Sequence, residues 1–172
     1  MVSGLLRNAV TLFGALTQRG AADPWKPLHC HFWITPFDCG TRVLKSDKYL
    51  QLAESAQLDF LIKTRCISVL LRQRCRFVNA SQLIVFRKPV GMFSRVQMET
   101  RILFADDKCT YFSHSFFVRN QRCGEVLVKT KFKRGARTVR PADIFGPCSL
   151  PKPTHLDEWD RATSQLASPS TP

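Results

Sequence analysis

The chain has 172 residues, of which 44% are apolar; this length favours one domain with a hydrophobic core over two domains. Its formal net charge is +13 at pH 7. Such an excess favours an anionic partner, namely nucleic acid, an anionic membrane surface or a phosphate-bearing ligand. Many organellar proteins are simply basic, and this alternative stays open at this point.

The cysteines give no sign of disulfides or of a zinc site. There are seven, without C-x-x-C pairs or zinc-finger spacing, so we expect reduced thiols in a reducing compartment. His29, Cys30 and His31 form the only dense group of metal-ligand types, and two imidazoles alone are a weak site. We therefore predict no metal and no cofactor. No arrangement of Ser, His and Asp and no phosphate-binding glycine loop is present either.

The N-terminal stretch, residues 1–26, differs in composition from the rest of the chain. Met1 to Gln18 is apolar and compatible with a helix, and no acidic residue precedes Asp23. An acid-free segment with arginine, serine and threonine is typical of mitochondrial targeting, so we predict a mitochondrial location. A secretory signal and an ordinary packing helix are the alternatives. Polar residues interrupt the apolar run, so we expect no transmembrane segment.

A long helix is predicted over residues 46–63. Ser46 is a suitable N-cap, Asp47 lies in the first turn, and apolar residues recur at helical spacing. No glycine or proline falls between Lys45 and Lys63. A second, short helix is expected over residues 67–73.

Five strands are predicted, one before this helix and four after it. They cover residues 28–34, 77–88, 95–104, 109–119 and 125–134. Polar and apolar residues alternate over 95–104 and 125–134, which indicates strands with one buried face. Turns are expected at Asp106-Asp107 and from Asn120 to Gly124. One long helix followed by antiparallel strands predicts an α+β fold in which the sheet wraps around the helix.

The C-terminal part is punctuated by proline. A short helix is expected over residues 155–165, with Thr154 as its cap. We therefore divide the chain into an N-terminal segment (1–26), a central domain (27–145) and a proline-rich extension (146–172).

Three segments together resemble a known family. They are HFWITPFDCG, then Y-L-x-L-A-E-x-A-x-L-D, and then a strand ending V-F-R-K-P. This order resembles the hotdog-fold acyl-CoA thioesterases, most closely the 4-hydroxybenzoyl-CoA thioesterase-like group, from about Leu28 to about Ile144. The resemblance implies a hotdog fold, an acyl-CoA ligand and a homodimer or heterodimer with another hotdog chain.

The catalytic loop of that family is not matched. Active relatives carry an acid in a pattern like D-x-D-x-x-x-H-M-N-N-x-x-Y, where it acts as nucleophile or general base. When the pattern is aligned on Tyr49, the acidic position falls on Cys39, and Asp38 lies one residue out of register. Glu54 matches a helix position that is commonly acidic in hotdog enzymes. If the chain is active, the resemblance makes Glu54 and Asp38 the catalytic candidates; Cys39 has no obvious histidine base.

Basic residues concentrate in the second half of the chain. Between Leu61 and Arg140 there are eighteen basic and four acidic residues. The densest run consists of Lys129, Lys131, Lys133, Arg134, Arg137 and Arg140. Its lysines share one face of a strand, so we predict a stripe that binds the phosphates of nucleic acid or coenzyme A. A solvated edge strand that uses lysine against aggregation is the alternative.

These observations lead to one hypothesis and two alternatives. We predict a non-catalytic hotdog protein that contacts RNA and proteins of a mitochondrial assembly such as the mitochondrial ribosome. The first alternative is an active mitochondrial acyl-CoA thioesterase that forms free acid and coenzyme A. The second is a non-catalytic binder of acyl-CoA or of an acyl carrier.

Overall fold

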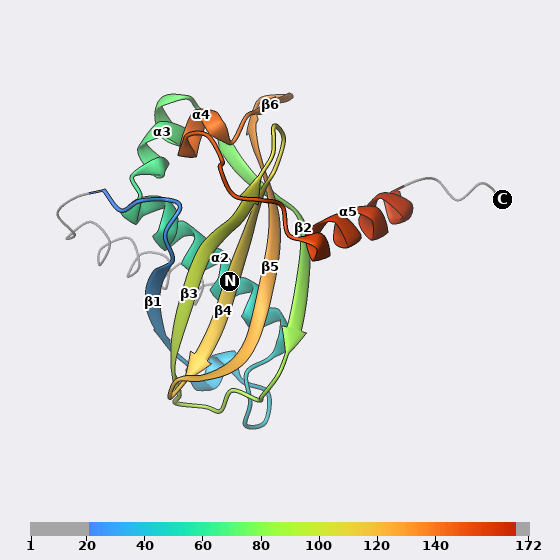
Figure 1. Cartoon of the computed structure of the whole chain (residues 1–172). Helices are drawn as coiled ribbons and strands as arrows, with labels where there is room; N and C mark the ends of the chain where they lie inside the picture. The colour runs from blue at the N-terminus through green and yellow to red at the C-terminus, as the bar shows by residue number, and fades with distance from the viewer. Residues whose placement is uncertain (1–20, 168–172) are drawn as a thin grey trace.

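The computed structural model describes residues 21–167, so the targeting segment predicted before residue 21 lies outside the described part. An antiparallel sheet curls around one long helix, α2 (Figure 1). The strands are β1 (Leu28–Trp33), β2 (Arg76–Phe86), β3 (Arg95–Ala105), β4 (Thr110–Val118), β5 (Gln121–Arg134) and β6 (Arg137–Val139). The helices are α2 (Ser46–Lys63), α3 (Cys66–Arg72), α4 (Ala142–Phe145) and α5 (Thr154–Ala167), with a 3₁₀ turn, η1, at Pro36–Asp38. The predicted α+β architecture, an antiparallel sheet wrapped around one long helix, is confirmed.

The strand order is β1-β3-β4-β5-β2, and β6 pairs with the end of β5. Every pairing is antiparallel, as the alternating sequence patterns predicted. The register places Trp33 opposite Arg95 and Thr100 opposite His114. β1 and β2 are therefore the two edges of the main sheet.

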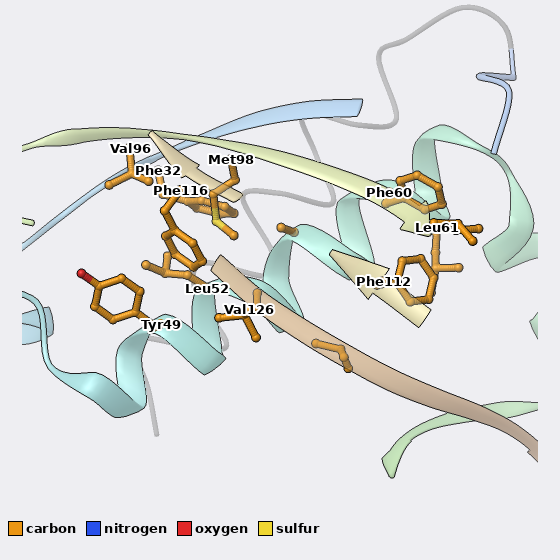
Figure 2. Close-up of a cluster of buried hydrophobic side chains, with 14 of the residues drawn as sticks. Phe32, Tyr49, Leu52, Phe60, Leu61, Val96, Met98, Phe112, Phe116 and Val126 are labelled. Carbon is orange, nitrogen blue, oxygen red and sulfur yellow. The ribbon is translucent and has the colours of Figure 1, made fainter. Parts of the chain in front are cut away.

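The core lies between α2 and the concave face of the sheet. The Phe60 ring of α2 packs edge-on against Phe112 of β4, with ring centroids 5.6 Å apart. Tyr49 lies near the N-terminal end of the same helix, and its ring centroid is 5.0 Å from that of Phe116. Figure 2 shows these side chains meeting between the helix and the strands. On β3 every second residue from Val96 to Ile102 is thus buried, which explains the period of two in its sequence, whereas β4 is buried on both faces.

Two local predictions were wrong. Lys45, with extended backbone, is the N-cap of α2, and Ser46 is already helical. The turn before β5 comprises Arg119 and Asn120, whereas Gly124 lies within the strand. A Cβ on Gly124 would lie 3.1 Å from the Val85 carbonyl oxygen and 3.4 Å from the Tyr49 ring, so this glycine permits a close approach rather than a turn.

Helix α5 covers part of the convex face of the sheet. Its Leu156 and Trp159 are buried against Tyr111 and Leu127, whose neighbours along β4 and β5 face α2. The helix predicted at 155–165 is therefore confirmed and packs on the sheet. Its carboxylate Asp160 accepts hydrogen bonds from the Tyr111 hydroxyl at 2.6 Å and from two lysines.

Candidate functional site

A cleft of about 300 Å³ opens at the N-terminus of α2. It is lined by Val43, Leu44, Ser46, Tyr49, Phe86, Arg87, Lys88 and Pro89, and we call it the α2 cleft. Two loops build it: the Leu44 amide donates to the Val90 carbonyl at 2.9 Å, and Val43 forms a bridge with Gly91. These backbone bonds hold the loop before α2 against the segment that joins β2 to β3.

The electrostatics of the α2 cleft favour an anion or a polarised carbonyl. The N-cap, Lys45, makes no side-chain cap, so its side chain satisfies none of the first amide groups of α2. An 18-residue helix carries partial positive charge at this end, and Arg87 and Lys88 add full charges. Apolar surface comes from Phe86 and Tyr49, whose rings are 5.1 Å apart.

Asp38, the first catalytic candidate, is buried and takes part in the η1 turn. Its side chain is 0% exposed. One carboxylate oxygen accepts hydrogen bonds from the Thr35 amide at 3.0 Å and the Thr35 hydroxyl at 2.7 Å. This capping box fixes the η1 turn. Asp38 is not among the residues that line the α2 cleft.

Cys39 does not replace the missing acid. The residue is buried, and burial together with the charge of Asp38 raises the pKa of its thiol. A thiol with a raised pKa has little thiolate at neutral pH, and the thiolate is the nucleophile. Cys39 therefore belongs to the core and not to the chemistry of the cleft.

Glu54, the second catalytic candidate, lies on the exposed side of α2. It is eight residues from Ser46, which places it about 12 Å along the helix from the α2 cleft. Within the described part of the chain, its carboxylate makes no hydrogen bond or ion pair. The structure does not bring Glu54 and Asp38 together, and a catalytic role for either stays a prediction.

The predicted basic stripe is divided between paired and free cations. Lys129 Nζ lies 2.7 Å from Asp160 Oδ1 of α5, and Arg140 pairs with Asp143 at 3.1 Å. Arg134 and Arg137, on the β5–β6 hairpin, are exposed and have no ion pair with a described residue. Whether these six residues bind phosphate stays a prediction, and Lys129 contributes to the α5 contact.

Most residues of the α2 cleft were not predicted from the sequence to be functional. Phe86, Arg87, Lys88 and Pro89 belong to the V-F-R-K-P segment, which carried the family resemblance but no functional assignment. Their contact with the N-terminus of α2 depends on a loop pairing between distant residues.

Among residues 21–167, no group of three or more His, Cys, Asp or Glu side chains could hold a metal ion. In the same residues, no helix has the length and hydrophobicity to cross a membrane.

Comparison with known proteins identifies the family. A family model described as the thioesterase-like superfamily matches residues 41–159. The chain belongs to this superfamily. No curated protein matches the chain. The family is thus the one that the sequence resemblance predicted.

Solved structures support the hotdog fold of this thioesterase-like chain. The 4-hydroxybenzoyl CoA thioesterase from Pseudomonas sp. strain CBS-3 is 17% identical to this chain, with a TM-score of 0.60. The match covers 69% of this chain and 96% of the Pseudomonas chain. A gentisyl-coenzyme A thioesterase is also 17% identical, with a TM-score of 0.62 over 68% and 98% of the two chains. DHNA-CoA thioesterase from Staphylococcus aureus is 11% identical, with a TM-score of 0.61 over 83% and 91%. At these identities the likeness shows the fold alone.

Proposed function

We propose that this thioesterase-like chain binds acyl thioesters of coenzyme A at the α2 cleft. Two of the similar structures are a 4-hydroxybenzoyl CoA thioesterase and a gentisyl-coenzyme A thioesterase. The cleft offers apolar rings for an acyl group, helix amides for a thioester oxygen and two cations for phosphate. Its chemistry therefore suits each part of such a ligand.

One observation favours binding over hydrolysis: no acidic residue lines the α2 cleft. Hydrolysis of a thioester needs a nucleophile or a general base within reach of the carbonyl or of a water beside it. Asp38 caps η1 and Glu54 is about two helical turns away. We infer that the chain holds the thioester and leaves it intact.

Calorimetry and a thiol-release assay test this proposal together. We expect saturable binding of a non-hydrolysable acyl-CoA thioether, and no release of coenzyme A from acyl-CoA above the uncatalysed rate. Glu54→Gln should leave both results unchanged, as should Glu158→Gln, an exposed control on α5. Hydrolysis that disappears only in Glu54→Gln would make the chain an enzyme, and absence of binding would remove the α2 cleft as a site.

A contact with RNA in a mitochondrial assembly is our second proposal. The exposed cations Arg134 and Arg137 on the β5–β6 hairpin support it, because free guanidinium groups bind phosphate. A density gradient of native extract should show the chain with a ribosome-sized particle that shifts after ribonuclease treatment. Migration as a small species that ribonuclease does not change would contradict this proposal and the ribosome in particular.

We further propose that β2 pairs with a hotdog partner, either a second copy or another chain. Among the described strands, β2 pairs only with β5, so its other edge has free backbone donors and acceptors. Its convex face exposes Val78, Leu83 and Val85. Light scattering should give twice the monomer mass, and Leu83→Lys should reduce it to the monomer. A monomeric wild-type chain would contradict a homodimer.

A further inference from the structure

A second cleft, about 730 Å³ in volume, lies at one end of the sheet, between the end of β1, the segment that joins β2 to β3 and the β4–β5 turn. Trp33, Met92 and Phe93 form its apolar part, and Lys88, Arg95 and Arg119 form its cationic part. We call these six residues the Trp33 cleft. No acidic residue is among those that line it. A smaller cleft adjoins it and shares Arg95 and Arg119.

The aromatic residues of this cleft are open to a ligand. Trp33 is 65% exposed and Phe93 is 68% exposed. Trp33 lies directly opposite Arg95 in the strand pairing, so both side chains project from the same face of the sheet. Phe93 has a φ of 61°, a left-handed conformation that a bulky side chain rarely adopts. Neither exposure nor this backbone conformation stabilises the fold.

The charge of the cleft is uncompensated. Neither Arg95 nor Arg119 has an ion pair with a described residue. The nearest acid on this face of β3 is Glu99, four residues or about 13 Å from Arg95, where it faces His29. Burial lowers the pKa of His31, in the adjoining cleft, and the positive charge of Arg95 lowers this pKa further.

We propose that the Trp33 cleft is a nucleotide-binding site, in which a base stacks on Trp33 and the phosphates contact Arg95 and Arg119. Stacking accepts any base, because every base has a π-face, and arginine forms paired hydrogen bonds with phosphate. A nucleotide can come from RNA or from the nucleotide end of coenzyme A. The site does not depend on the proposed acyl-thioester site, although the two clefts share Lys88 and Pro89.

The test uses four probes with the full chain at fixed ionic strength. They are adenosine 3′,5′-bisphosphate, a labelled single-stranded RNA, inorganic phosphate and anionic phospholipid vesicles. We expect the bisphosphate or the RNA to bind, and Trp33→Ala and Arg95→Gln each to weaken that binding roughly tenfold. Tighter binding of RNA would assign the RNA source, and tighter binding of the bisphosphate would assign coenzyme A.

Matched controls are an exposed aromatic and an exposed cation outside the cleft. Phe37→Ala and Arg101→Gln should change the affinity less than twofold. The proposal is overturned if neither nucleotide binds, if only phosphate or only vesicles bind, or if both cleft variants bind as wild type. Binding of acyl-pantetheine, which lacks a nucleotide, tests the α2 cleft separately, so the two proposals fail independently.

Discussion

Cations and aromatic side chains occur together at two places in the molecule, with different partners. Under α5, the Lys129 ammonium lies 5.4 Å from the centre of the Tyr111 ring and 2.7 Å from an Asp160 oxygen. In the Trp33 cleft, the arginines have no carboxylate partner among the described residues. The same side-chain types thus stabilise the fold at one place and remain available to a ligand at the other.

Removing the Trp159 ring, which attaches α5 to the sheet, should have the largest effect on the free energy of unfolding. Trp159 is 9% exposed and packs against Tyr111, with ring centroids 6.3 Å apart. Trp159→Ala should lower the free energy of unfolding by about 3 kcal/mol, because a large buried side chain leaves a cavity. Chemical denaturation measures this. Leu166→Ala, on the same helix but 86% exposed, should change it by less than about 0.5 kcal/mol.

Removing the carboxylate under α5 should have the next largest effect. Hydrogen bonds from Lys129, Lys152 and Tyr111 outweigh the effect of burial and lower the pKa of Asp160 to about 2. Asp160→Asn should therefore lower the free energy of unfolding by about 1–2 kcal/mol at pH 7, allowing for solvent screening.

The same group gives this contact a pH dependence. The folded pKa of Asp160 lies below its ordinary value of 3.8, so the unfolded chain binds the proton first as the pH falls. Its contribution should be complete above about pH 5 and lost towards about pH 2. Wild type and Asp160→Asn should converge in stability over this range. A constant difference between the two curves would contradict the assignment.

A substitution in the Trp33 cleft should instead increase the stability of the fold. Phe93→Asn should raise the free energy of unfolding by about 0.5 kcal/mol, because asparagine adopts the left-handed conformation at lower cost. Phe37→Asn, at an exposed position without a positive φ, should give no increase. Loss of stability in Phe93→Asn would show that the ring supports the fold.

The smallest effect should come from Arg95→Gln. Because this guanidinium has no ion pair with a described residue, the free energy of unfolding should stay within about 0.5 kcal/mol of wild type. A larger loss, measured by the same denaturation, would mean that the cation serves the fold.

Sequence patterns predicted those elements whose residues repeat over many positions. α2 and β3 were found because their buried apolar residues recur at helical spacing in the one and at every second position in the other. β6 and α4 were missed because three and four residues are too few to show a period. Gly124 was taken for a turn residue, since its contacts with Tyr49 and Val85 come from remote parts of the chain.

The candidate sites were less accessible from sequence. Asp38 and Glu54 were named from a family pattern, but burial and distance decide what each can do, and neither is visible in the sequence. Trp33, Arg95 and Arg119 are far apart in the chain and meet only through strand register and a turn. The seven cysteines, expected to be reduced, are all free in the structure.

The most direct test of the α2 cleft is a map of amide chemical shifts during titration with a non-hydrolysable acyl-CoA thioether. We expect the largest changes at Ser46, Phe86 and Lys88, which line that cleft. The same titration with acyl-pantetheine should also shift these amides. Changes confined to other surfaces, or none at saturating ligand, would contradict acyl-CoA binding at the N-terminus of α2.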